Sequence, residues 1–142
     1  MNISSSAIPE HWKRLMAPAV RAALGAAGRT MPEVIAEADA KAELTIQGEI
    51  ANYLRLHGVE YLKPDGRKKS PLPKGWPDFT FAYRGVAVGM EVKTPLGVLS
   101  RDQVSQHARM APHWRMLVVR GVPEVQALLR AIDAELESPE KQ

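Results

Sequence analysis

The chain has 142 residues, 45% of them hydrophobic and 25% charged, a length and composition that suit one globular domain. It contains no cysteine, which excludes disulfide bonds, thiolate catalysis and thiolate zinc sites. No apolar run approaches the roughly 20 residues that span a bilayer, and the first residues lack the apolar core of a signal peptide. We therefore expect a cytoplasmic protein without a membrane partner.

The first part of the sequence predicts helices. Residues 1–30 are rich in alanine and carry apolar residues at helical spacing, so we expect an N-terminal helical extension over residues 1–40. Thr30 followed by Glu33 is a helix-start pattern, and Gly58 is typical of a residue that ends a helix. This predicts a helix from about position 31 to about position 57.

The rest of the chain alternates strand and helix patterns, which predicts a compact domain over residues 41–137 followed by a polar tail, 138–142. We expect a short strand at 59–62, a loop rich in Pro, Gly and Lys at 63–77, and two apolar strands joined at Arg84-Gly85. A capping-box pattern at Ser100 predicts a second helix, 114–120 reads as a buried strand, and Pro123 opens a last helix. This order, helix, three strands, helix, strand, helix, indicates the mixed α/β (α+β) class.

The two strands joined at Arg84-Gly85 form the most informative segment, residues 76–94. A two-residue turn makes position 83 face 86, and the same register sets Asp78 opposite Glu91. Alternation then gives one face made of Phe79, Phe81, Tyr83, Val86, Val88, Met90 and Val92. The other face is small in its middle, with room for a helix, and carries charge only at the end that holds Asp78 and Glu91.

Two carboxylates that face each other repel, so a cation must compensate for them. Lys93, two residues beyond Glu91, supplies one positive charge, and a divalent metal supplies more. Oxygen ligands around an open site suit Mg²⁺ or Mn²⁺, ions that also bind substrate phosphates. The same residues are also compatible with a surface salt bridge of Lys93 with either acid.

Three motifs in this order resemble a known nuclease family. They are Gly75-Trp76-Pro77-Asp78, then Glu91-Val92-Lys93-Thr94-Pro95, then Leu99-Ser100-Arg101-Asp102-Gln103. Together they resemble the VRR-NUC (virus-type replication-repair nuclease) domain of the PD-(D/E)XK superfamily. The resemblance covers roughly positions 43–132, and residues 1–40 lie outside it.

The resemblance implies a restriction-endonuclease-like core, in which helices flank a mixed four-stranded sheet with the order α-βββ-α-β-α. It also implies Mg²⁺- or Mn²⁺-dependent hydrolysis of DNA phosphodiester bonds. Small stand-alone members resemble phage and bacterial enzymes associated with Holliday-junction or branched-DNA cleavage and repair, and commonly act as homodimers. No nucleotide cofactor is implied.

Carried over to this sequence, the family pattern assigns Asp78 and Glu91 as metal ligands and Lys93 as the catalytic lysine. The carbonyl of Val92 is a further ligand candidate, and Gln103 matches a glutamine that positions the site. Gln103 is also the fourth residue of the capping box begun by Ser100, so a purely structural role stays open.

The family also has an acid on the first helix, for which two residues compete. Glu43 lies on the apolar stripe of Ile46 and Ile50, whereas Glu49 lies about 100° around the helix from Ile50. The inward position favours Glu43, and either acid is also compatible with a solvated helix surface.

Basic residues ahead of the acidic site are the candidates for DNA contacts. The net charge is +3, and positions 55–75 hold six Lys/Arg against two acids, an excess of four. The candidates for phosphate-backbone contacts are Arg67, Lys68, Lys69 and Lys74. A solvated loop is the alternative for this cluster.

For the whole chain, the alternatives to a branched-DNA nuclease are a flap or duplex nuclease and a non-catalytic nucleic-acid-binding module.

Overall fold

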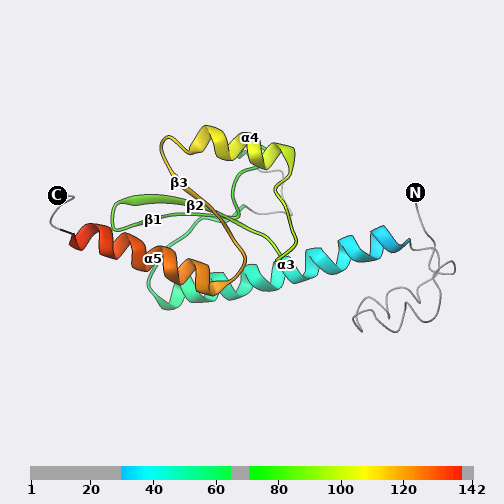
Figure 1. Ribbon diagram of the computed structural model, residues 1–142, viewed down its shortest axis with the longest axis horizontal. Coiled ribbons are helices and arrows are strands. Elements are labelled where there is room, and N and C mark those ends of the chain that lie inside the picture. The colour runs from blue at the N-terminus through cyan, green and yellow to red at the C-terminus, as the bar shows by residue number, and fades with distance from the viewer. Residues whose placement is uncertain (1–29, 65–70, 139–142) are drawn as a thin grey trace. The chain divides into compact units, whose positions relative to one another are not determined.

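The computed structural model describes residues 30–64 and 71–138 (Figure 1). The N-terminal extension up to residue 29, the basic residues Arg67, Lys68 and Lys69, and the end of the tail from residue 139 lie outside this range. The described elements are α3 (Met31–Leu56), β1 (Phe79–Tyr83), β2 (Val86–Val92), α4 (Arg101–Met110), β3 (Arg115–Val119) and α5 (Val122–Glu137). Within the described residues this is a mixed α+β arrangement of three helices and a three-stranded sheet.

Helix α3 begins where the sequence predicts. The Thr30 N–H donates to Glu33 Oε2 at 3.0 Å, and the Glu33 N–H donates to Thr30 Oγ1 at 3.4 Å. This reciprocal pair satisfies two backbone donors that the first turn of a helix leaves open. The chain divides into two compact units between Leu44 and Thr45, inside this helix, and the second unit holds the sheet, α4 and α5.

The end of α3 corrects one prediction, the strand at 59–62. Gly58 has a φ of +69°, and the Val59 N–H donates to the Leu54 carbonyl at 2.9 Å, which closes the helix as a Schellman turn. The Val59 N–H is thereby used at the end of the helix and is not available to a strand, and the Val59 side chain is buried there. Of the expected strand only Leu62 pairs with the sheet, through one isolated bridge to Thr80. The described sheet therefore has three strands, not four.

The sheet order is β1-β2-β3, with β1 antiparallel and β3 parallel to the central strand β2. The predicted turn is confirmed: Arg84 and Gly85 have φ values of +48° and +85°, and Tyr83 pairs with Val86. Positive φ at both turn residues gives the twist that a two-residue hairpin needs. Because β2 is central, a side chain near its end is covered from both neighbouring strands.

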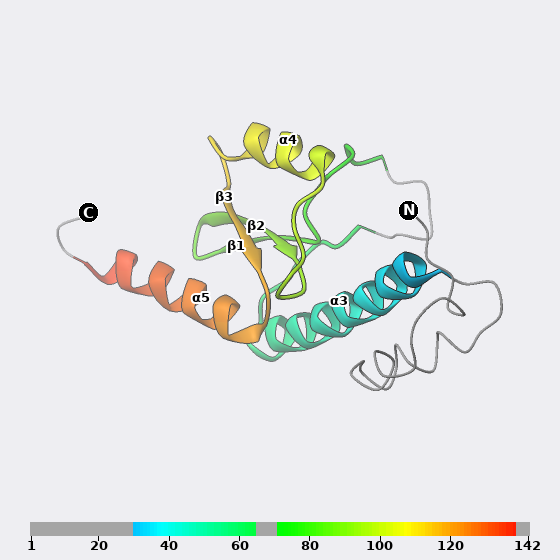
Figure 2. The same ribbon diagram turned by 45° about the vertical axis from the view of Figure 1, so that its right-hand side comes forward.

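The two faces of the sheet have different partners. The predicted apolar face packs on α5 and on the C-terminal part of α3 in one buried cluster, which includes Ile50, Leu54, Phe79, Val88, Met90, Val92, Val125, Leu129 and Ile132. Helix α4 lies on the opposite side of the sheet from α5 (Figures 1 and 2). A Cβ added to Gly89 on that side would lie 2.7 Å from Met116 Sδ, so the small residue permits close packing there.

The remaining elements agree with the sequence. Ser100 caps α4 in a full capping box, and α5 has proline in its first turn and buries an apolar side. The strand expected at 114–120 is β3, although four of its five residues are only half-buried and Val119 alone is buried. Among the described residues, no helix combines the length and the apolar character of a membrane span.

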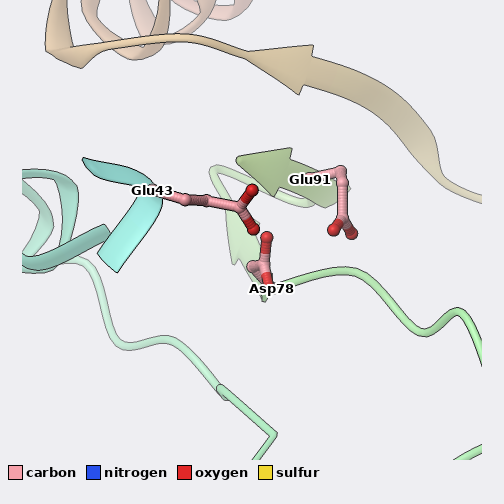
Figure 3. A group of neighbouring side chains, drawn as sticks. All are labelled: Glu43, Asp78 and Glu91. Carbon is pink, nitrogen blue, oxygen red and sulfur yellow. The ribbon is translucent and has the colours of Figure 1, made fainter. Parts of the chain in front are cut away.

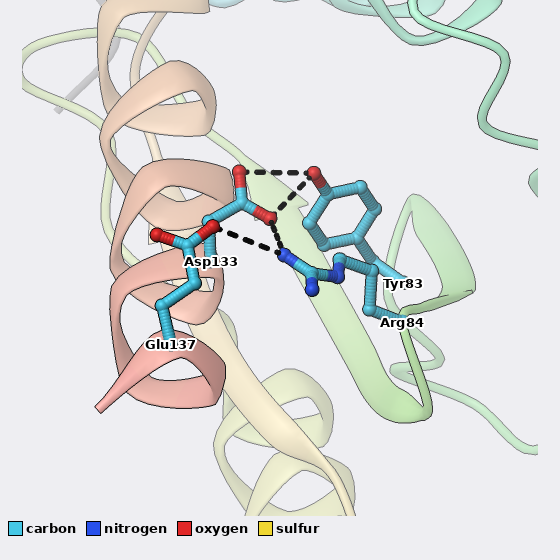
Figure 4. Close-up of polar contacts among 4 residues, drawn as sticks. All are labelled: Tyr83, Arg84, Asp133 and Glu137. Carbon is cyan, nitrogen blue, oxygen red and sulfur yellow. Dashed lines mark hydrogen bonds and ion pairs between the residues drawn. The ribbon is translucent and has the colours of Figure 1, made fainter. Parts of the chain in front are cut away.

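A polar cluster fastens the hairpin turn to α5 (Figure 4). Asp133 Oδ1 accepts from the Tyr83 hydroxyl at 2.9 Å and from Arg84 Nη1 at 2.7 Å, and Glu137 Oε1 lies 3.9 Å from the same guanidinium nitrogen. The hydrogen bond from Arg84, and then that from Tyr83, holds the pKa of Asp133 below its ordinary value of 3.8. Ionised Asp133 therefore stabilises the folded state.

This cluster predicts a pH-dependent stability difference for Asp133→Asn. Because the pKa of Asp133 is lowered on folding, its contribution is complete above about pH 4 and is lost as the pH falls through the folded-state pKa. We expect a small decrease in Tm for Asp133→Asn at pH 7, since the pair is exposed and screened. The two Tm values should converge as the pH falls through the folded-state pKa of Asp133, below its ordinary value. A Tm difference that stays constant over this acid range would contradict the ionic origin.

Candidate metal centre

Asp78 lies immediately before β1, at the open end of the hairpin. The last pair of the ladder is Phe79 with Met90, so Asp78 and Glu91 occupy the next position of the register. Asp78 does not continue the ladder through its backbone there. Its Oδ2 accepts the Val92 N–H at 2.8 Å, which ties the carboxylate to the end of β2. The hairpin thereby fixes Asp78 close to the second acid.

Glu91 lies near the end of the central strand β2 and is only 2% exposed. Its Oε1 accepts from Gln103 Nε2 at 2.6 Å. The other end of the same amide caps α4, because Gln103 Oε1 accepts the Ser100 N–H at 2.8 Å. Gln103 therefore caps α4 and contacts Glu91 with the same side chain, so the first turn of α4 lies directly against the carboxylate of Glu91.

Figure 3 shows the three acids that come together, Glu43 from α3, Asp78 and Glu91. Each offers a carboxylate oxygen, and these oxygens lie within 4.8 Å of one another. Glu43 is half-buried, whereas Glu49 is exposed on the helix surface. Glu43 is thus the helix acid that joins the site. Three carboxylates at this spacing repel one another unless a proton or a cation lies among them.

Lys93 follows β2 directly and has a half-buried side chain. Its N–H donates to the Val119 carbonyl at 3.0 Å, which continues the strand geometry one residue past Val92. The charges of Asp78 and Lys93 both act on the pKa of His107, in opposite directions. The ammonium and the acid pair therefore belong to one local electrostatic environment, as the Glu91-x-Lys93 spacing predicts.

His107 is the residue of this site that the sequence did not reveal. In the structure it is 8% exposed, and its Nε2 lies 3.6 Å from Glu91 Oε2. Burial lowers the pKa of His107; Lys93 acts in the same direction, and Asp78 and a backbone hydrogen bond with Gly75 oppose it. The position of His107 one helical turn after Gln103 places the two side chains on one face of α4, but that spacing does not show that this face meets Glu91.

Of the basic residues that the sequence suggests for DNA contacts, only Lys74 lies in the described part of the chain. Lys74 is exposed, four residues before Asp78, while Arg67, Lys68 and Lys69 lie outside the described residues. Lys63 turns inward instead, and its Nζ donates to the buried Gln47 Oε1 at 2.5 Å. Trp76 packs edge-on against Trp114, with ring centroids 6.1 Å apart.

Comparison of the chain with protein-family models found no match, and comparisons with curated proteins and with solved structures likewise found none. The functional assignment therefore rests on the geometry of the acidic cluster and on the sequence motifs.

Proposed function

We propose that this protein is a Mg²⁺- or Mn²⁺-dependent DNA endonuclease. The observation that carries the proposal is the convergence of three carboxylates, from Glu43, Asp78 and Glu91, with Lys93 two residues after the last of them. The donor set fits the metal, because carboxylate oxygens suit Mg²⁺ and Mn²⁺. A chain without cysteine offers no thiolate to softer ions.

When bound, Mg²⁺ or Mn²⁺ would supply Lewis-acid chemistry, polarising the phosphodiester and lowering the pKa of a bound water. The residues of the chain provide the geometry. Asp78, Glu91 and Glu43 would hold the ion, with the carbonyl of Val92 as a further ligand. Lys93 orients the attacking water or stabilises the negative charge that develops on the phosphate. Gln103 keeps the carboxylate of Glu91 in place.

The proposed family is the VRR-NUC type of PD-(D/E)XK nuclease, with a restriction-endonuclease-like core. The arrangement that supports it is an acid-bearing antiparallel hairpin, followed by a helix and then by a strand parallel to β2. The motif order of Asp78, Glu91, Lys93 and Gln103 supports the same family. The fourth strand of the expected core has only the Leu62–Thr80 bridge in its place.

The proposed substrate is branched DNA such as a Holliday junction, cut by a homodimer inside a bacterial or phage-infected cell. Exposed Lys74, with the basic residues that precede it in the sequence, supports contact with phosphates rather than with base edges. Residues 30–64 and 71–138 include no evident base-reading element, which favours recognition of DNA shape over DNA sequence.

The test is cleavage of a panel of end-labelled substrates: a four-way junction, a flap, a nicked duplex and a plain duplex. We expect cleavage with Mn²⁺ or Mg²⁺, none with excess chelator, and a preference for the junction. Equal cutting of every substrate would contradict the structure preference only. Tight binding without cleavage under any metal condition would instead indicate a nucleic-acid-binding module.

A further inference from the structure

The buried imidazole of His107 lies beside the acidic cluster, and the proposed reaction does not use it. Its Nε2 is inaccessible to solvent and has no hydrogen-bond partner among residues 30–64 and 71–138. It faces Glu91 Oε2 across 3.6 Å, an ion-pair distance slightly beyond a hydrogen bond. A polar atom buried in this way destabilises the fold, and such costs persist mainly at functional sites.

The place of His107 in α4 relates it to Gln103. The two residues are four apart, so their side chains share one face of the helix. Gln103 Nε2 contacts Glu91 Oε1 at 2.6 Å, while His107 Nε2 faces the other oxygen of the same carboxylate. Two residues on one face of α4 therefore face the two carboxylate oxygens of Glu91, one residue to each oxygen.

His107 also connects to the segment that carries Asp78. Its imidazole forms a backbone hydrogen bond with Gly75, three residues before Asp78. Gly75 in turn packs against the first turn of α4, where an added Cβ would lie 2.2 Å from the Asp102 carbonyl oxygen. The imidazole thus lies between the two chain segments that supply Asp78 and Glu91.

We propose that His107 is a positioning residue for Glu91, whose carboxylate it holds from the side opposite Gln103. This inference rests on the proposed metal site and deepens it. A carboxylate has free rotation about its last bond, and a metal ligand that must share an ion with Asp78 and Glu43 needs that rotation fixed. Partners behind a metal ligand commonly supply this restraint, and their loss weakens metal binding about 10–100-fold.

Three substitutions at position 107 separate the polar contact from simple packing. His107→Gln sets an amide near the position of Nε2, His107→Asn sets the same amide near the position of Nδ1, and His107→Phe fills the volume without a polar atom. The measurement is Mn²⁺ affinity of the full chain by calorimetry, without DNA and at one pH. Steady-state kcat and KM on a cleaved substrate are a second readout.

We expect His107→Phe and His107→Asn to bind Mn²⁺ about 10–100-fold more weakly than the wild type, with KM for DNA unchanged. His107→Gln should stay within a few-fold of the wild type, because it keeps a polar atom facing Glu91 Oε2. The matched control is His113→Gln, an exposed histidine just beyond the same helix, which should bind Mn²⁺ as the wild type does.

The comparison of Gln with Asn decides the question, since the two side chains have the same polarity and differ in reach. Equal Mn²⁺ affinity of His107→Phe and the wild type would overturn the inference. Equal losses of Mn²⁺ affinity in all three variants, together with lowered Tm values in chelator, would also overturn the inference and leave His107 a packing role. A wild-type chain that binds no Mn²⁺ would overturn the metal site itself.

Discussion

Glu91→Gln is expected to reduce cleavage at least about 100-fold while the protein stays folded and still binds DNA. The substitution keeps the shape of the side chain and its amide oxygen still accepts from Gln103 Nε2. It removes the negative charge that faces Glu43 and Asp78 within 4.8 Å. The loss should fall on metal affinity and on kcat, since neither the hairpin nor α4 is altered.

The same change should separate stability from activity. In chelator, the Tm of Glu91→Gln should equal or exceed that of the wild type, because repulsion among three acids is relieved. Added Mn²⁺ should raise the Tm of the wild type and leave that of the variant unchanged, since an ion that binds only the folded state stabilises it. Both curves are measured by differential scanning fluorimetry or calorimetry.

Glu49→Gln is the matched control, because this exposed acid lies on the same helix as Glu43 but outside the cluster. It should cleave DNA and respond to Mn²⁺ as the wild type does. If Glu91→Gln retains full cleavage, or if Mn²⁺ raises its Tm as much as that of the wild type, Glu91 is not a metal ligand.

Gly75→Ala has the largest expected effect on stability. Gly75 has a φ of +81°, which costs an alanine about 1–2 kcal/mol. Its Cβ would also lie 2.2 Å from the carbonyl oxygen of Asp102 and 2.8 Å from the backbone nitrogen of Gln103. Both contacts are with backbone atoms, so no side chain can move aside. We expect a loss of about 2–4 kcal/mol in the free energy of unfolding, measured by urea denaturation.

Gly85→Ala is the control for this prediction. Gly85 has an almost identical φ of +85°, but nothing lies within 4 Å of an added Cβ. The free energy of unfolding of Gly85→Ala should fall only by the backbone cost, about 1–2 kcal/mol, and its Mn²⁺ affinity should stay unchanged. Gly75→Ala should also bind Mn²⁺ more weakly, because displacement of the first turn of α4 moves Gln103 away from Glu91. Equal losses in the free energy of unfolding for the two variants would show that the contact of Gly75 with α4 does not contribute to stability.

Local patterns predicted most of the fold because their causes are local. The start of α3 follows from the exchange of hydrogen bonds between Thr30 and Glu33, and the hairpin register follows from the two-residue turn at Arg84-Gly85. The turn signal, with strand alternation, was sufficient to bring Asp78 and Glu91 together. The choice of Glu43 over Glu49 also followed from helical spacing, since one faces inward and the other is exposed.

The predictions from sequence fail where distant contacts or competing hydrogen bonds determine the structure. Residues 59–62 have strand-like side chains, yet the end of α3 takes the Val59 N–H, and a single bridge at Leu62 remains. His107 was not identified because its contact with Glu91 depends on how α4 docks on the sheet, a relation that helical spacing within α4 alone does not contain.

The short turn at Arg84-Gly85 has a consequence for how this gene can change. Substitutions along the hairpin alter packing by degrees, but a single codon inserted at or deleted from the turn offsets one strand against the other by one position. Such an offset sends one of the two acids to the opposite side of the ribbon. In this segment, length is therefore under tighter constraint than composition.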